Sequence, residues 1–219
     1  RGEVLLRDLQ SNTTTLVSVD LAGNPIVNGN AEKCRITPDA RYIAFSSSST
    51  EHTTVPDNNG GGNDVFIRDM QSGTTSLVSH NLANTSAGNS FSTLQAISAD
   101  GRFVVFQSFA SDLTNLPDSN NAVDLFALDT RTSRMIPVSV NDFGTSSPTL
   151  GSGNAAVNND GTKIVFESDA GNIAVGDFNG TTDVFLRNNV VPRNNALFDF
   201  DGDGKSDLST FRPSTGGWY

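Results

Sequence analysis

The chain has 219 residues, a formal net charge of −10 and a pI near 4.4. This charge argues against a nucleic-acid partner, because contact with a phosphate backbone needs clustered Lys and Arg. Hydrophobic residues make up 36% of the chain and occur as short β-branched and aromatic runs between polar turns, which predicts an all-β fold. No apolar run approaches the roughly 20 residues of a membrane span, so we expect none.

A six-residue motif recurs along the chain at nearly constant spacing. Its copies are EVLLRD at 3–8, DVFIRD at 64–69, DLFALD at 124–129 and DVFLRN at 183–188. The steps from Val4 to Val65, Leu125 and Val184 are 61, 60 and 59 residues. Such regularity predicts a repeat architecture, with repeats near 3–63, 64–123, 124–182 and 183–188.

Each complete repeat is expected to form four antiparallel strands. In the clearest copy these are 94–97, 102–108, 124–129 and 135–140. The first two are joined by Asp100-Gly101, a strong hairpin signal. Ala40 replaces that glycine in the preceding repeat, so a different turn type is expected there.

Tight turns before the fourth strands and a two-sided core complete this prediction. Asn12, Gly73 and Ser133 stand where a left-handed residue would close each hairpin, and Ser133 fits least well. Phenylalanines recur at two repeat positions, so we expect each small sheet to be covered on both faces: Phe45, Phe106, Phe166, Phe66, Phe126 and Phe185. Cys34, the only cysteine, is expected to be a buried hydrophobe.

This pattern resembles the TolB-like β-propellers, which are built of WD-like repeats. The resemblance rests on S-A-D-G-R-F-V-V-F at 98–106 and on the D-V-F motif. It implies four-stranded blades, and it predicts that residues 1–193 form an open arc of a propeller. Family blades are nearer 40 residues, so the surplus lies in two long loops per repeat. An arc cannot close a ring, so remaining blades of a longer parent chain are expected partners.

The sharpest chemical motif is DFDGDGKSD at 199–207. Asp199, Asp201 and Asp203 occupy positions 1, 3 and 5 of a calcium loop, the Lys205 carbonyl position 7 and Asp207 position 9. This spacing predicts a calcium site. The segment resembles FG-GAP or VCBS repeats, whose loops bind calcium, so residues 194–219 are expected to begin such a repeat.

Weaker candidate calcium sites precede the third strands. Asp118, Asn120 and Asp124 have the spacing D-x-N-x-x-x-D, and the next repeat matches it with Asp177, Asn179 and Asp183. In the first full repeat, Asp57 and Asn59 precede Asp64 with one residue more. These oxygens suit a calcium shell completed by water, but they equally suit Asx turns that cap backbone N–H groups.

Sequence motifs do not favour an enzyme, and no catalytic residue is predicted. There is no G-x-S-x-G elbow or H-E-x-x-H motif, and the only histidines are His52 and His80. The leading hypothesis is a calcium-stabilised, non-catalytic structural or interaction module of a secreted or surface bacterial protein, with protein or carbohydrate as partner. The alternatives are an accessory region of a secreted hydrolase or lyase, and a periplasmic TolB-like interaction domain.

Overall fold

The computed structural model describes residues 2–188, 211–212 and 217–218. In this part of the chain every regular element is a β-strand. No helix that is long and apolar enough to cross a membrane occurs among these residues. The all-β prediction is therefore confirmed.

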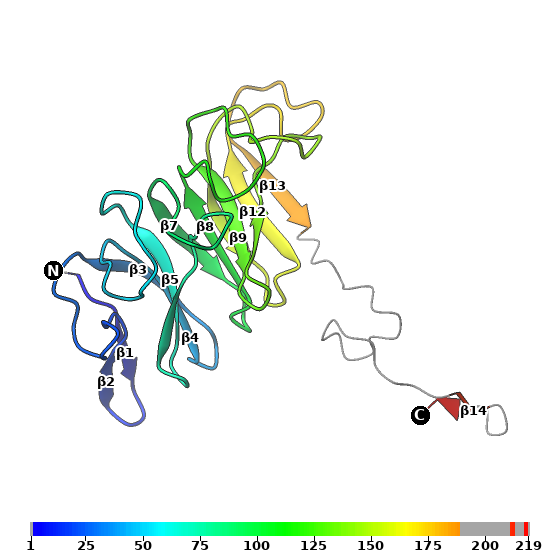
Figure 1. The fold of residues 1–219 in the computed structure, drawn as a ribbon. Coiled ribbons are helices and arrows are strands. Elements are labelled where there is room, and N and C mark those ends of the chain that lie inside the picture. Colours follow the sequence, from blue (N-terminus) through cyan, green and yellow to red (C-terminus); the bar gives the residue numbers. More distant parts are fainter. Residues whose placement is uncertain (1, 189–210, 213–216, 219) are drawn as a thin grey trace.

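The strands fall into five antiparallel sheets (Figure 1). The first hairpin is β1 (Leu5–Asp8) with β2 (Thr13–Leu16). One four-stranded sheet has β3 (Ala31–Ile36), β4 (Tyr42–Ser47), β5 (Asp64–Asp69) and β6 (Thr74–Leu77). The next has β7 (Ser92–Ile97), β8 (Phe103–Ser108), β9 (Asp124–Asp129) and β10 (Arg134–Pro137). A three-stranded sheet has β11 (Ser152–Val157), β12 (Lys163–Ser168) and β13 (Asp183–Asn188), and β14 (Phe211–Arg212) pairs with β15 (Gly217–Trp218).

Each four-stranded sheet follows chain order, as a propeller blade does. The β1–β2 hairpin supplies the third and fourth strands of one blade, two complete blades follow, and β11–β13 supply the first three strands of another. The sheets stand side by side in this order (Figure 1). The predicted partial β-propeller of four-stranded blades is thus confirmed.

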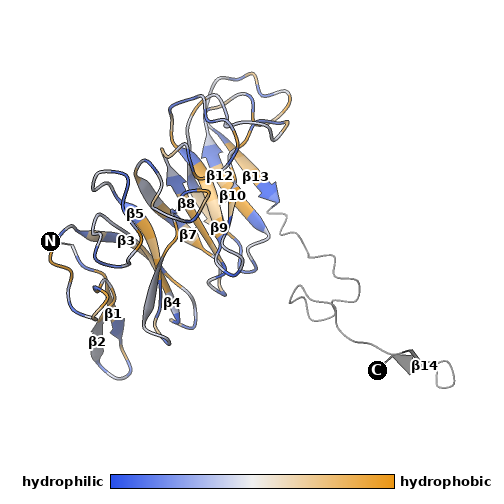
Figure 2. Ribbon diagram, viewed as in Figure 1, coloured by the Kyte–Doolittle hydropathy of each residue, from blue (hydrophilic) through white to orange (hydrophobic). Residues whose placement is uncertain are grey.

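Hydrophobic clusters fill the spaces between successive sheets, and Figure 2 shows apolar residues gathered on the central strands. Between the two complete blades, Val65 and Ile67 of β5 meet Val104 and Phe106 of β8. Similar clusters lie on either side, and the repeated phenylalanines stack in pairs across β4–β5, β8–β9 and β12–β13. The expectation that each small sheet is covered on both faces is therefore confirmed for the two complete blades, but it is wrong for the last sheet, where Val184 is exposed.

The outer face of the last sheet differs from its counterparts. Val184 on β13 is 73% exposed, whereas Val65 and Leu125 at the same repeat position are fully buried. In the complete blades this position contacts the following sheet. The contrast shows that burial here comes from the neighbouring blade and not from the strand itself.

The turn between the first two strands contradicts one sequence expectation. Ala40 has φ +57° and donates its N–H to the Thr37 carbonyl at 2.8 Å. Gly101 has φ +73° and makes the equivalent bond to Ser98 at 3.0 Å. The prediction of a different turn type at Ala40 is therefore wrong, because alanine here has the same left-handed conformation and the same hydrogen bond as glycine. The prediction for the hairpins before the fourth strands is confirmed, since Asn12, Gly73 and Ser133 all have positive φ.

Cys34 also departs from expectation, because its thiol is exposed. The residue lies in β3 where the register to β4 shifts between Glu32 and Arg35. Lys33 beside it has φ +41°. This bulge interrupts the simple alternation of buried and exposed positions, so the apolar character of cysteine does not decide its burial.

Candidate functional site

The loops predicted as weak cation sites end at the first residue of each third strand. Asp64 opens β5 and is 4% exposed, and Asp124 opens β9 and is 3% exposed. Aspartate is rarely buried to this extent without a compensating partner. These two carboxyl groups therefore need a structural or functional explanation.

Asp64 is held by side chains from its own loop and from the following strand connection. The Ser79 hydroxyl donates to Asp64 Oδ1 at 2.8 Å and accepts the Val65 N–H at 3.0 Å. Asn59 donates through Nδ2 to Asp64 Oδ2 at 3.0 Å, and its own N–H bonds to Asp57 Oδ1 at 2.8 Å. Asn59 Oδ1 is buried and has no hydrogen-bond partner within the described part of the chain.

The next blade repeats this arrangement around Asp124. The Ser139 hydroxyl donates to Asp124 Oδ1 at 3.2 Å and accepts the Leu125 N–H at 2.8 Å. Asn120 Nδ2 donates to Asp124 Oδ1 at 3.5 Å, and the Asn120 N–H donates to Asp118 Oδ1 at 3.4 Å. The structure thus brings Asp118, Asn120 and Asp124 together, as the sequence spacing predicts.

Each pair of acids borders a small cavity. One has a volume of about 10 Å³ and is lined by Asp57 and Asp64, and the other has about 20 Å³ and is lined by Asp118 and Asp124. This is about the space of a single water molecule or ion. The remaining lining includes several Ser and Thr side chains, and within the described residues no Lys or Arg borders either cavity.

Burial and like charge act together on these carboxyl groups. Burial raises the pKa of Asp64 to about 7; the Asp57 carboxylate adds to the rise, while the hydrogen bonds from Ser79 and Asn59 oppose it. Burial likewise raises the pKa of Asp124 to about 7, with Asp118 as the next contribution. Both sites therefore favour a proton or a bound cation over a bare negative charge.

The third predicted loop is more open than the first two. Asn179 donates through Nδ2 to Asp183 Oδ2 at 3.0 Å and accepts the Thr181 N–H at 2.9 Å. Asn179 is exposed, and Asp177 and Asp183 are only partly buried. This loop keeps the Asx-type bonding of its counterparts without their enclosed carboxylate.

The other metal prediction cannot be placed in the structure. Asp199, Asp201, Asp203, Lys205 and Asp207 lie outside the described residues. Within the described residues, no group of three or more His, Cys, Asp or Glu side chains is arranged to hold a metal ion. Each blade loop instead brings two carboxylates, one amide and several hydroxyls together.

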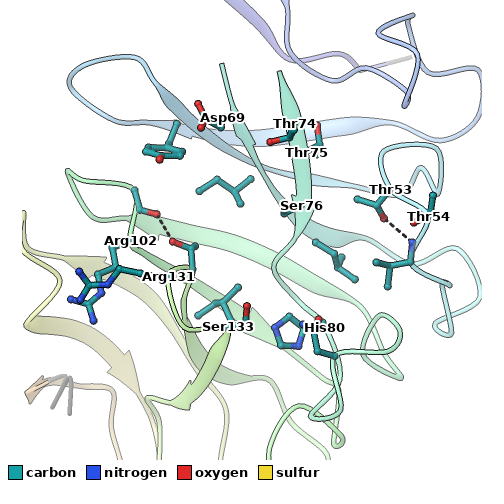
Figure 3. A pocket seen from close by; sticks show the side chains of 18 of the residues that line it. Thr53, Thr54, Asp69, Thr74, Thr75, Ser76, His80, Arg102, Arg131 and Ser133 are labelled. Atoms are coloured by element: carbon teal, nitrogen blue, oxygen red, sulfur yellow. Dashed lines mark hydrogen bonds between the residues drawn. The ribbon is translucent and has the colours of Figure 1, made fainter. Parts of the chain in front are cut away.

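A larger groove lies between the two complete blades (Figure 3). Its volume is about 740 Å³. All four residues of β6 line it, and the β7–β8 turn and the end of β9 contribute the opposite wall. Tyr42, Ile67 and Leu128 give it an apolar part, while Ser, Thr and charged side chains supply the remainder.

His80 borders this groove and was not predicted as a site residue (Figure 3). The side chain is buried, its Nδ1 lies 2.8 Å from the Asn81 carbonyl, and Nε2 has no partner within the described residues. The sequence does carry a signal for it, because Val19 and Val140 occupy the same position in the other repeats. A polar residue at a buried repeat position marks this blade as different.

The other histidine belongs to the core. His52 Nε2 lies 2.9 Å from Ser47 Oγ, and its Nδ1 lies 2.8 Å from the Val19 carbonyl. The ring packs edge-on against Phe45 and Phe66 and is 1% exposed. Although a Ser–His contact is the start of a catalytic arrangement, no substrate can reach this one, so its role is structural.

Comparison with known proteins gives matches at the level of structure. No family model matches the sequence, and no curated protein matches it. Among solved structures, TolB from Acinetobacter baumannii shares 13% identity with a TM-score of 0.48, over 85% of this chain and 35% of that chain. The β-propeller domain of the Trilobed protease from Pyrococcus furiosus shares 14% identity with a TM-score of 0.47, over 84% of this chain and 45% of that one.

A prolyl endopeptidase structure matches with a TM-score of 0.50 and 12% identity, over 86% of this chain and 24% of that chain. At this identity the match shows a shared fold alone. The chain spans about a third of the TolB structure and a quarter of the endopeptidase. The candidate sites must therefore be interpreted from their own geometry.

Proposed function

We propose that this chain is a non-catalytic structural or interaction module of a secreted or surface-attached bacterial protein, with blades stiffened by calcium. The observation that carries the calcium proposal is the repeated pair of acids at one cavity, Asp57 with Asp64 and Asp118 with Asp124. A buried carboxylate that lies beside a second acid and has no positive neighbour is costly, and a divalent cation offsets that cost directly.

The donor set fits a hard cation that prefers oxygen. Carboxylates and hydroxyls line both cavities, and calcium accepts six to eight oxygen ligands in irregular geometry. The unpaired Asn59 Oδ1 supplies one further oxygen in the first loop. Water molecules complete the shell, because the side chains alone are too few.

The C-terminal loop is a second part of the same proposal and rests on spacing alone. Asp199, Asp201, Asp203 and Asp207 with the Lys205 carbonyl would hold one calcium ion. Calcium is plentiful outside the cell, so a protein that depends on it there suits an extracellular or surface location. A periplasmic location is the alternative.

The accessory-region hypothesis is retained as a second candidate. The prolyl endopeptidase match covers 24% of that chain, so an arc of this size occurs within a much larger enzyme. In that case catalytic residues would lie elsewhere in a parent chain. A catalytic domain in the same reading frame would favour this candidate, whereas further repeats with a surface anchor would favour the first.

Thermal unfolding with calcium and with chelator tests the calcium proposal. Calcium at a hundred times its dissociation constant should stabilise the binding unit by about 2.7 kcal/mol. Asp203→Ala should remove the part of this stabilisation that comes from calcium at the C-terminal loop. Asp57→Ala combined with Asp118→Ala should remove the part that comes from calcium at the blade loops. Asp142→Ala, an exposed acid outside these loops, is the control. An identical melt with and without calcium contradicts the proposal.

A further inference from the structure

We propose that the groove beside β6 binds an extended peptide segment, which adds to the sheet β3–β6 as a fifth strand. This proposal deepens the interaction role proposed above and rests on it. It names both the place of contact and the chemical class of the partner.

The outer edge of β6 has the backbone groups that strand addition requires. β6 is the last strand of its sheet, and the Val78 N–H donates to the Val65 carbonyl at 2.8 Å. Since bonding alternates along an antiparallel pair, Ser76 also faces β5. The N–H and C=O groups of Thr75 and Leu77 therefore point away from β5, toward any strand added at this edge.

The neighbouring blade lacks one of these groups. Leu77 pairs with Phe66, and the equivalent residue in β10, which pairs with Phe126, is Pro137. Proline has no N–H to donate, and it is a common means of blocking an exposed sheet edge. The edge of β6 is thus competent for pairing at a position where the edge of β10 is blocked.

His80 adds a feature that distinguishes this groove. With Nδ1–H donating to the Asn81 carbonyl at 2.8 Å, Nε2 keeps a lone pair that accepts no hydrogen bond. Valine fills the same buried position at Val19 and Val140, so the fold does not require a histidine here. An unpaired buried acceptor is costly, and a donor from a bound segment would remove that cost.

Nε2 lies beneath the groove surface, so the imidazole must turn toward the groove to meet a ligand. The donors that suit it are a backbone N–H, a hydroxyl or an amide side chain. Ile67 and Leu128 also line the groove, and they offer a place for an apolar side chain. These features describe an extended segment with alternating polar and apolar residues.

The aromatic residue of the groove does not favour a carbohydrate. The Arg41 guanidinium lies over the Tyr42 ring at 4.8 Å from its centre. Gly101 approaches the same ring so closely that an added Cβ would lie 2.4 Å from Tyr42 Cδ2. With these neighbours against it, the ring lacks the open face on which sugars stack, so the observations favour a peptide.

A random ten-residue peptide library displayed on phage provides the probe, with the full chain as target. Selected peptides should lose about tenfold in affinity for Leu77→Pro, because one main-chain hydrogen bond is removed. His80→Val should give a similar loss. Both substitutions copy residues that other blades already carry, and Leu16→Pro in β2 is the matched control that should leave affinity unchanged. On binding, the amides of Thr75 and Leu77 should become protected from hydrogen exchange.

Peptides that bind Leu77→Pro and His80→Val as well as the wild type, without protecting these amides, would overturn the groove proposal while leaving an interaction role intact. Failure to select any peptide would also overturn it. Binding to a glycan array that His80→Val abolishes would replace the peptide with a carbohydrate. None of these outcomes alters the calcium melt, so failure of the calcium proposal would be seen separately.

Discussion

The buried acids make a quantitative prediction about stability and pH. On folding, the pKa of Asp64 rises from an ordinary value of 3.8 to about 7, and the pKa of Asp124 rises by the same amount. At 1.36 kcal/mol per pH unit, each of these two pKa shifts corresponds to about 4 kcal/mol in the free energy of unfolding. Because the folded chain holds these protons and the unfolded chain releases them, stability should fall between pH 4 and pH 7 and then level off.

The replacement Asp64→Asn should remove the share of this pH dependence that belongs to Asp64. The amide is neutral throughout, and it keeps the size of the protonated carboxyl. At pH 5 the substitution should lower the free energy of unfolding by about 1 kcal/mol. The reason is that an N–H of the new amide faces a donor, either the Asn59 amide or the Ser79 hydroxyl. At pH 8 the variant should be about 2 kcal/mol more stable than the wild type in chelator, because the wild type loses about 1.36 kcal/mol per pH unit between pH 5 and pH 7.

Urea unfolding followed by circular dichroism, at four pH values from 5 to 8, measures the difference directly. Subtracting variant from wild type cancels groups that titrate in both, such as His52, whose pKa is lowered chiefly by burial. Asp69→Asn is the control whose difference from the wild type should stay constant between pH 5 and pH 8, because Arg41 lowers the pKa of Asp69 to about 2. Its contribution is present above pH 4 and is lost as pH falls toward 2. A pH profile of Asp64→Asn that parallels the wild type would refute the reasoning.

Two further predictions use the repeats as their own controls. Ala40→Gly should stabilise the chain by about 0.5–1 kcal/mol in urea unfolding, because glycine adopts the left-handed conformation without strain. Gly101→Ala should destabilise the chain, because the new Cβ would meet the Tyr42 ring. Leu125→Ala should cost about 2–5 kcal/mol, whereas Val184→Ala should cost well under 1 kcal/mol because its side chain is 73% exposed. Equal losses at the last two positions would contradict the inter-blade origin of the core.

Strand positions could be predicted closely because the repeat supplies several independent copies of each element. The third strands were expected at 64–69, 124–129 and 183–188, and the structure places them at those residues. Alternation of apolar residues and the Asp-Gly turns point to the same register in each copy. The end of the fourth strand was expected at Val140 and occurs at Pro137, the repeat position at which β2 and β6 also end. Beyond it the Ser139 hydroxyl accepts the Leu125 N–H in place of a backbone carbonyl, which ends the regular ladder.

Burial and strain could not be predicted with the same accuracy, since they depend on contacts between blades. The loop spacing located Asp118 and Asp124, but it gave no sign that Asp124 would be 3% exposed. Nor did the Asp124 and Asp183 loops differ in motif, although only the first encloses its carboxyl group. Cys34 likewise became exposed through a bulge in β3 that no local propensity indicates.

Departures from the repeat carry more information about function than the repeat itself. Positions that are the same in every blade, such as the stacked phenylalanines, are explained by packing between sheets. His80 in place of valine has no such explanation, and it lies on the groove of one blade, beside a sheet edge that is not blocked by a proline such as Pro137. Since a repeated scaffold supplies its own reference residue at each position, such departures locate a binding site without any related sequence. The same reasoning treats the acidic cavities as a property of the scaffold, because they recur in both complete blades. The cavities are therefore assigned to stability and the groove to recognition.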